Sequence, residues 1–368
     1  MKFYCNGMDL ANATNVVSKA LAVNKNIPIL EGIKIKAKED KVILSAYNQE
    51  LFIEKTIKAE VFLEGEVVVN GKLFNEYTNK LGGLSTIEIE KGDNNKIIIK
   101  FDNSKTEIAY LEVDNFPALG DYNNETSIII KEREYKDLIE KVIFCASMND
   151  SRLLLKSCNM EVIDNQIEAV CLDGYRVAIA QKDIIEKKGE LKFIVLGKII
   201  SEISKILTDS DDEIIISKAN NMVVIDLGHT KIRTTTVEGE FYNYRNNLPN
   251  VINNEVIIKK DNLINCLSRV NIISKDLAFN KITITIEDNK FYIASESEKG
   301  RIDESMDCKA TGEKIKFGIN SRFLTDAVNR IKEDYLRIEI EKSVKPILIK
   351  RTDSEDYKCV ILPLRLIG

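Results

Sequence analysis

The sequence predicts an α+β protein built from three tandem copies of one domain, each with two helices packed on antiparallel sheet. The first observation is a strand-then-helix segment that occurs three times, at residues 67–81, 193–207 and 317–331. The second is a companion strand-then-helix segment at residues 128–142 and 256–270. Because the copies recur at nearly constant spacing and without gaps, we expect a triplicated domain.

Apolar spacing predicts the helix in each segment. In residues 193–207, FIVLGKIISEISKIL, an apolar strand runs into Gly-Lys, and Ile then recurs on one helical face. Residues 128–142 and 256–270 share an i, i+3, i+4, i+7 stripe, which residues 3–17 show more weakly. A basic residue opens each helix of the first kind: Lys72, Lys198 and Arg322.

Short β-branched runs between the helices predict antiparallel hairpins and meanders. They lie at residues 41–46, 97–101, 214–217 and 282–287, each shortly before a turn signal that contains Asn. The helices are too few to cross between every pair of strands, so βαβ crossovers are not expected.

Two linkers indicate the domain boundaries. Residues 116–126 and 241–254 contain Pro and several Asn, and each lies just ahead of an Ile-rich strand. We therefore expect domains at residues 1–122, 123–250 and 251–368.

Composition narrows the class of protein. The net charge of −5 gives no global basic signal for nucleic acid, although charge can be segregated between faces. No apolar run approaches the length that a bilayer requires, and no signal peptide is evident, so we expect a cytoplasmic protein. The 7 cysteines follow no paired pattern, which indicates reduced, mostly buried thiols.

No catalytic or metal-binding constellation is evident. The single histidine, His229, lies in the turn-like LGHTKI, so a histidine-based triad has little support. The Gly-Lys pairs at 71–72 and 197–198 lack the other residues of a phosphate loop. The acidic run 209–213 lacks the Gly and distal Glu of a calcium loop. We expect no catalytic residue, no cofactor and no metal.

The polar helix faces leave two interpretations open. In the second helix of each copy, an acid follows the opening base by four residues and could pair with it: Glu76, Glu202 and Asp326. The faces are then either plain solvated surfaces or a weakly basic surface that tolerates a polyanion with few close contacts.

Four motifs on this triplicated frame resemble the bacterial sliding clamp, the beta subunit of the replicative DNA polymerase III holoenzyme. They are NIPIL at 26–30, DNFPAL at 114–119, DGYRVA at 173–178 and LPLRL at 362–366. The resemblance implies that two subunits close head to tail as a ring around duplex DNA, with the helices lining the hole. It implies a processivity factor without catalytic activity, which tethers the replicative polymerase, clamp loader and repair proteins.

The resemblance also implies a hydrophobic pocket between the second and third copies, which binds short peptides of Gln and apolar residues. Apolar walls would bury the peptide's side chains, while Arg176 and the backbone near Gly174 would meet its polar groups. The lining residues would be Leu155, Leu172, Gly174, Tyr175, Arg176, Val177, Tyr242, Asn246, Asn247, Phe279, Val344, Pro346, Leu362, Pro363, Leu364 and Arg365.

Two further sets of residues follow from the resemblance and the helix faces. The joint between subunits would place the strand around Thr106 and Ile108 against Ile272 and Ile273 of the partner subunit. The DNA-facing residues would be Asn24, Lys25, Lys72, Asn149, Arg152, Lys198, Lys205, Arg269 and Arg322.

Two other classes remain as alternatives. One is an enzyme on a repeated α+β frame, with Asp173 and Arg176 as its candidates. The other is a scaffold that binds proteins independently of DNA. Perturbed carboxylates in a pocket too small for a peptide would favour the enzyme, and an acidic inner surface would favour the scaffold.

Overall fold

The computed structural model describes residues 1–23, 27–117 and 126–366. Contacts divide the chain into two compact units, which are described separately, and the middle repeat contributes strands to both. The first unit comprises Met1–Arg133, Ile184–Leu191 and Lys205–Thr236. The second comprises Glu134–Asp183, Lys192–Ser204 and Val237–Gly368.

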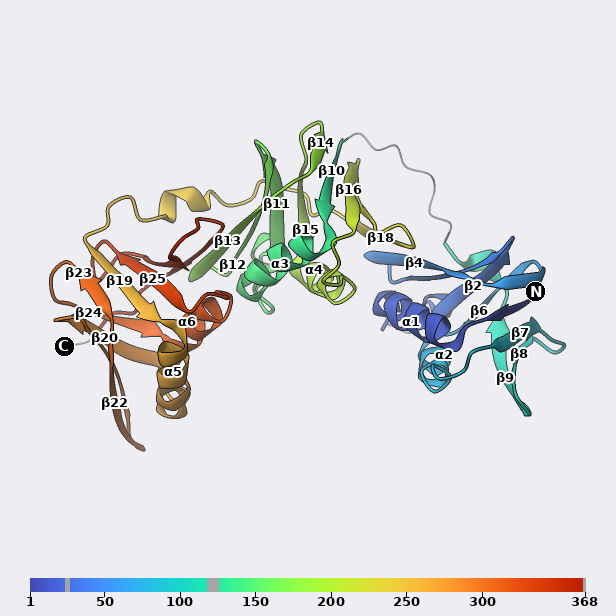
Figure 1. Cartoon of the computed structure of the whole chain (residues 1–368), viewed down its shortest axis with the longest axis horizontal. Helices are drawn as coiled ribbons and strands as arrows, with labels where there is room; N and C mark the ends of the chain where they lie inside the picture. The colour runs from blue at the N-terminus through green and yellow to red at the C-terminus, as the bar shows by residue number, and fades with distance from the viewer. Residues whose placement is uncertain (24–26, 118–125, 367–368) are drawn as a thin grey trace. The chain divides into compact units, whose positions relative to one another are not determined.

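Each predicted strand-then-helix segment forms a strand that runs directly into a helix (Figure 1). The α-helices of the described ranges are α1 (Gly7–Val17), α2 (Gly71–Thr78), α3 (Glu132–Val142), α4 (Gly197–Ser204), α5 (Lys260–Ser274) and α6 (Ser321–Val328). Asparagine caps explain where α2 and α6 begin. Asn70 Oδ1 accepts a hydrogen bond from Leu73 N at 2.9 Å, and Asn320 Oδ1 accepts one from Phe323 N at 3.1 Å.

One antiparallel sheet runs through the first unit. Its strands are β1 (Lys2–Cys5), β2 (Gly32–Lys38), β3 (Lys41–Tyr47), β4 (Leu51–Lys58), β5 (Glu60–Leu63), β6 (Gly65–Asn70), β7 (Ile87–Lys91), β8 (Lys96–Phe101), β9 (Ser104–Leu111), β10 (Thr126–Lys131), β14 (Glu186–Lys188), β16 (Glu213–Ala219), β17 (Met222–Asp226) and β18 (Thr230–Thr235). The strand order is β14-β10-β16-β17-β18-β4-β3-β2-β6-β9-β8-β7-β1-β5. The first and second repeats join where β18 pairs with β4, with Ile232 opposite Ile53.

Two antiparallel sheets form the second unit. Its strands are β11 (Ser157–Ile163), β12 (Gln166–Leu172), β13 (Arg176–Asp183), β15 (Lys192–Leu196), β19 (Asn254–Lys259), β20 (Lys281–Glu287), β21 (Lys290–Ser297), β22 (Gly300–Asp307), β23 (Lys309–Thr311), β24 (Ile315–Asn320), β25 (Tyr335–Ile340), β26 (Ile347–Arg351) and β27 (Tyr357–Ile361). The sheet orders are β15-β11-β12-β13-β27-β26-β25-β19-β23 and β22-β21-β20-β24. The second and third repeats join where β13 pairs with β27, with Ala178 opposite Cys359.

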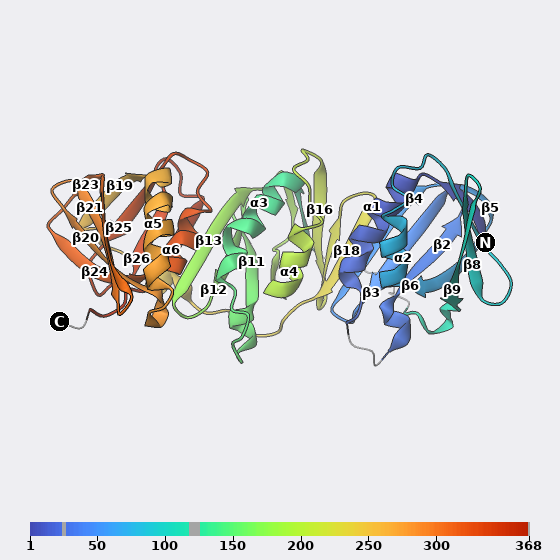
Figure 2. The same cartoon turned by 90° about the horizontal axis from the view of Figure 1, so that it is seen from below.

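Pairs of helices lie side by side against these sheets. Figure 2 shows α1 beside α2 in the first unit and α5 beside α6 in the second. Buried hydroxyl groups connect both pairs: Thr14 and Thr78 lie 2.7 Å apart, and Ser274 and Ser321 lie 2.9 Å apart. The two-helix, antiparallel-sheet plan expected for each repeat is therefore present.

Burial alternates between successive residues of a strand. In β20, Ile282, Ile284 and Ile286 are buried, while Thr283 and Thr285 are half-exposed on the other face. The cysteines are all free thiols, and only Cys308 is not fully buried, as expected from their spacing.

The C-terminal strand is shorter than predicted. The sequence suggests a strand through residues 359–366, but β27 ends at Ile361. Pro363 has no backbone N–H, so it cannot continue the ladder. Leu364 instead makes a single bridge to Gly318 of β24.

Candidate functional site

A cavity of about 320 Å³ opens in the second unit, where β13 of the second repeat meets β27 of the third. This volume lies at the small end of the range for ligand sites. The lining is mostly apolar and aromatic. The residues are Arg152, Leu155, Leu172, Gly174, Tyr175, Arg176, Val177, Tyr242, Tyr244, Asn247, Val360 and Leu362.

One wall is the tight turn between β12 and β13. Asp173 Oδ1 accepts hydrogen bonds from the backbone N–H groups of Tyr175 and Arg176, both at 3.0 Å. Gly174 has a φ of +88°, a conformation that other residues rarely adopt. The Asp-Gly pair of the DGYRVA motif therefore sets the shape of this wall.

Arg176 is enclosed by its own protein rather than directed at a ligand. Its side chain is only 9% exposed. Its Nε donates to Asp173 Oδ2 at 2.9 Å, Nη1 to Asp326 Oδ2 at 2.7 Å, and Nη2 to the carbonyl of Phe144 at 2.9 Å. Every guanidinium nitrogen therefore has a partner within the chain, and Arg176 also lines the cavity, where it is expected to meet a peptide.

The opposite wall is the segment 241–247, which the sequence marks only as a linker. It contains the 3₁₀ turn Tyr244–Asn247. The buried carboxylate of Glu168 accepts hydrogen bonds from the Tyr244 hydroxyl and from Arg245 Nη2, the latter at 2.6 Å. Burial, together with the hydrogen bond to Glu168, raises the pKa of the Tyr244 hydroxyl well above its usual value. The linker is thus fastened to the sheet.

The C-terminal tail forms the third wall. Leu362 N donates to the carbonyl of Tyr175 at 2.9 Å, and Leu364 N donates to the carbonyl of Gly318 at 2.8 Å. A Cβ on Gly318 would lie only 2.7 Å from the Leu364 oxygen, so glycine is needed for this close approach.

The residues after Leu362 line a second cavity, of about 630 Å³. Its lining consists of Lys316, Phe317, Ser343, Val344, Pro363, Leu364, Arg365 and Leu366. Because consecutive tail residues line the two cavities, one extended ligand could contact both along the tail.

The structure brings together most of the expected pocket residues. Val344, Pro363, Leu364 and Arg365 line the second cavity rather than the first. Asn246, Phe279 and Pro346 line neither of these two cavities. The first cavity takes in Leu155, Leu172, Gly174, Tyr175, Arg176, Val177, Tyr242, Asn247 and Leu362.

Three residues that line the first cavity were not among the expected pocket residues: Arg152, which was expected to face DNA, and Val360 and Tyr244, which were not singled out. Val360 lies two residues before Leu362, so strand periodicity would have placed both on one face. Tyr244 lies two residues after Tyr242 in FYNYR. It is buried, and its hydroxyl donates a hydrogen bond to Glu168, a partner that no local sequence pattern predicts.

Arg152, which lines the first cavity, forms an ion pair with Asp150. Arg152 Nε and Nη2 donate to the Asp150 carboxylate at 3.0 and 2.9 Å. Hydrogen bonds from the side chain and backbone of Arg152 lower the pKa of Asp150 to about 2. Arg152, expected to face DNA, is therefore bound to Asp150 and lines the cavity.

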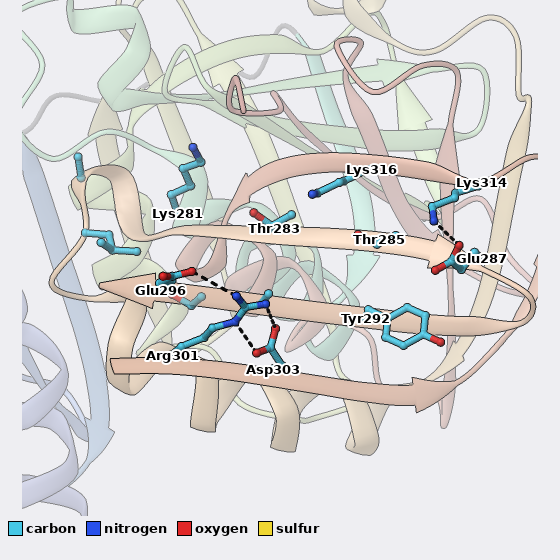
Figure 3. A pocket seen from close by; sticks show the side chains of 14 residues that line it. Lys281, Thr283, Thr285, Glu287, Tyr292, Glu296, Arg301, Asp303, Lys314 and Lys316 are labelled. Atoms are coloured by element: carbon cyan, nitrogen blue, oxygen red, sulfur yellow. Dashed lines mark hydrogen bonds and ion pairs between the residues drawn. The ribbon is translucent and has the colours of Figure 1, made fainter. Parts of the chain in front are cut away.

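A larger cavity, of about 870 Å³, lies over the open face of the sheet formed by β20, β21, β22 and β24 (Figure 3). Much of its charge is paired internally. Arg301 Nε contacts Asp303 at 2.6 Å, and Lys314 contacts Glu287 at 2.5 Å. Its floor is a polar strand surface that includes Thr283 and Thr285, so it offers fewer apolar groups to a ligand than the first cavity.

The geometry gives no support to acid–base catalysis at the first cavity. Asp173 and Asp326 both bind the guanidinium of Arg176, which leaves neither placed as a free acid or base. Among the described residues, no group of three His, Cys, Asp or Glu side chains is arranged to hold a metal ion. No helix in the described ranges is long and apolar enough to span a membrane.

The expected DNA-facing residues differ in their surroundings. Asn24 and Lys25 lie outside the described residues. Arg269 Nε contacts Glu304 Oε1 at 2.5 Å, so this cation is already paired. The other side chains are exposed: Lys72, Asn149, Arg152, Lys198, Lys205 and Arg322.

The residues expected at the subunit joint also differ in exposure. Ile272, in the last turn of α5, is 60% exposed, and Ile273 is half-buried. Ile108 is already buried within the chain, and the Thr106 hydroxyl lies 2.6 Å from the Tyr77 hydroxyl. Among the described residues, residues 104–108 of β9 pair on one side only, with β8.

Three domain families match the chain in succession. The N-terminal, central and C-terminal domains of the DNA polymerase III beta subunit match residues 1–120, 129–243 and 245–365. Together with the repeated fold, these matches define the class as three-domain sliding clamps. The chain belongs to the DNA polymerase III beta subunit family, the bacterial sliding clamps.

Individual relatives agree with this assignment. The beta sliding clamps of Staphylococcus epidermidis and Staphylococcus aureus are each 26% identical, over 96% and 95% of this chain and 96% of theirs. A Eubacterium rectale structure assigned to DNA polymerase III beta subunits is 28% identical, covers both chains fully and has a TM-score of 0.93. The Bacillus subtilis sliding clamp, at 23% identity and full coverage of both chains, shares the fold with a TM-score of 0.94.

Proposed function

We propose that this DNA sliding clamp, a polymerase processivity factor, closes head to tail with a second copy as a ring around duplex DNA. Its first cavity then takes short peptides of the replicative polymerase, the clamp loader and repair proteins. The observation that carries the peptide site is the meeting of DGYRVA and the LPLRL tail around one apolar cavity, although they are far apart in the sequence.

The lining suits a short peptide with apolar side chains. Leu155, Leu172, Val177, Val360 and Leu362 supply apolar walls. Each apolar side chain that the peptide buries would contribute about 1.5–3 kcal/mol before the cost of ordering. One published relative supports a ligand-binding role: the structure of a Pseudomonas aeruginosa clamp, 21% identical with a TM-score of 0.95, was determined with griselimycin bound.

Helix starts support contact with DNA. Lys72, Lys198 and Arg322 each occupy the second residue of their helix, α2, α4 and α6. A cation there faces the positive end of the helix dipole, at a cost of about 0.3–1 kcal/mol, so the dipole gives no reason for a base at these positions. Contact with the phosphates of DNA would account for the basic side chains at these positions. Few such contacts favour sequence-independent, salt-sensitive binding that allows sliding.

Free edges and an exposed apolar residue support the ring joint. The unpaired side of β9 around Thr106 and Ile108 would meet Ile272 and Ile273 of the partner subunit. An unpaired strand edge and an exposed Ile favour aggregation unless a partner covers them.

The remaining parts of the proposal follow from family membership. The chain is a processivity subunit without catalytic activity of its own, acts in the cytoplasm, and has domains at residues 1–122, 123–250 and 251–368. The family matches support three domains in these regions, although the third match begins before residue 251. The enzyme and DNA-independent scaffold readings are not favoured, because all three matches are to clamp domains.

Size-exclusion chromatography with mass detection tests the ring directly. We expect twice the chain mass of 41.7 kDa at micromolar concentration. A monomer at that concentration would contradict the proposed joint. Ile272→Asp should convert the dimer to monomer, whereas Leu73→Asp, at another exposed helix position, should not.

A further inference from the structure

A carboxylate that does not line the first cavity is bonded to the turn that forms its wall. Asp326, on α6 of the third repeat, contacts Arg176 of that turn at 2.7 Å. We propose that Asp326 is a positioning residue for peptide binding, which acts by holding Arg176 and, through it, the wall from Asp173 to Arg176. This inference rests on the proposed function of the cavity as a peptide site.

Contacts within the chain hold the Arg176 side chain in place, which suits it to positioning the turn rather than to binding a ligand. Its guanidinium stacks on two rings, with its carbon 4.2 Å from the centroid of Phe323 and 5.2 Å from that of Phe144. Its nitrogens donate to Asp173, Asp326 and the Phe144 carbonyl. Turning toward a ligand would break buried, charge-assisted hydrogen bonds.

Of these acceptors, Asp326 is the one that connects the turn to the third repeat. Asp173 belongs to the turn itself, and Phe144 belongs to the second repeat. Helix α6 is a fixed support, because Leu324, Ala327 and Val328 are buried on it. The ion pair therefore adds a side-chain connection between the turn and the third repeat, which also supplies the C-terminal tail and its backbone hydrogen bond from Leu362 N to the Tyr175 carbonyl.

Local spacing alone would give Asp326 a different partner. Arg322 lies four residues earlier on the same helix, a favourable spacing for an ion pair. The structure instead joins Asp326 to Arg176 across the joint between repeats. Glu76 holds the matching position on α2 of the first repeat and provides a control with the same helical setting.

Loss of the Asp326 carboxylate should loosen the wall without removing any group that touches the peptide. Gly174 in the turn has no neighbouring atom within 4 Å of an added Cβ, so the turn has space to move. The peptide would then have to order the wall on binding. We expect an affinity about tenfold lower, within the range for substitutions that do not touch the ligand.

Fluorescence anisotropy with the full chain tests this role. The probe is a fluorescein-labelled hexapeptide that contains one Gln followed by Leu and Phe. We expect Asp326→Asn to weaken binding about tenfold, and Glu76→Gln to change it by less than about twofold. Asp326→Glu, which keeps the charge, should recover part of the loss.

A double-mutant cycle separates positioning from a general loss of stability. In an Arg176→Met background, Asp326→Asn should have no further effect on affinity, because its partner is absent. Undiminished weakening in that background, or wild-type affinity for Asp326→Asn alone, would overturn the inference. Failure of the wild-type chain to bind the probe would instead overturn the proposed peptide site, and this inference with it.

Discussion

Leu362→Ala is the most direct perturbation of the proposed peptide site. The Leu362 side chain lines the first cavity and is 41% exposed in the free chain. Its backbone N–H, which holds the tail to Tyr175, is kept in the alanine variant. The substitution therefore removes apolar wall and leaves the hydrogen bond that places the tail.

The size of the effect follows from the exposed part of this side chain. Complete burial of a Leu side chain is worth about 1.5–3 kcal/mol, and the peptide can cover only the part still exposed. The substitution also removes apolar contact area on the peptide side. We therefore expect binding to weaken by about 1–1.5 kcal/mol. That corresponds to an affinity about fivefold to twelvefold lower.

Anisotropy titration of the same labelled hexapeptide measures this loss. Leu73→Ala is the matched control, because Leu73 on α2 is 51% exposed and lines neither the first nor the second cavity. Equal affinities for the wild type and Leu362→Ala, or equal losses in both variants, would refute the assignment of the cavity.

Three further predictions concern the tail, the DNA contacts and pH. Deleting residues 364–368 should abolish peptide binding while the dimer mass is retained, as titration and size exclusion would show; unchanged affinity would contradict the role of the tail. Lys72→Ala with Arg322→Ala should reduce the slope of log DNA affinity against log salt by about 0.9 per lost phosphate contact; an unchanged slope would place both residues away from DNA. Burial alone would raise the pKa of Asp137, but hydrogen bonds from Lys182 and Lys332 hold that pKa well below its usual value. Ionised Asp137 therefore stabilises the folded chain above the ordinary Asp pKa of about 3.9, and this stabilisation is lost as the pH falls. Asp137→Asn should flatten the decline in unfolding free energy between about pH 5 and pH 2, measured by urea titration; parallel curves would show that Asp137 does not contribute.

Local patterns were sufficient to predict the repeated elements. Residues 193–207 carry their strand, glycine and helical Ile stripe within one short window, and the structure places β15 and α4 there. The Asp-Gly turn between β12 and β13 likewise has its cause in neighbouring residues, since Asp173 accepts the backbone hydrogen bonds of Tyr175 and Arg176. Such signals are visible because their physical causes lie within a few residues of each other.

The contacts that build the cavity could not be predicted in this way. Asp326 lies four residues from Arg322, yet it binds Arg176, which is far away in the sequence. Glu168 fixes the 241–247 segment through Tyr244 and Arg245, although that segment has the composition of a plain linker. Arg176 and Asp326 meet only after the second and third repeats pack, and Glu168 meets Tyr244 and Arg245 only after the linker folds back on the second repeat, so no local spacing rule identifies these partners.

The resemblance predicts the peptide pocket, and the structure adds which of its polar groups are already bonded within the chain. Arg176, expected to meet the peptide, is occupied by Asp173, Asp326 and Phe144. The available polar groups at the cavity are instead on exposed residues such as Tyr175, Tyr242 and Asn247. Peptide preference should therefore respond to these side chains more than to Arg176 itself.

Retention on circular DNA tests the ring most directly. The chain is incubated with a bacterial clamp loader, ATP and a nicked circular duplex, and bound protein is measured by gel filtration before and after the circle is cut once. A closed clamp that slides should stay on the circle and run off the ends of the linear product. Equal retention on circular and linear DNA, or no retention on either after loading, would contradict the account.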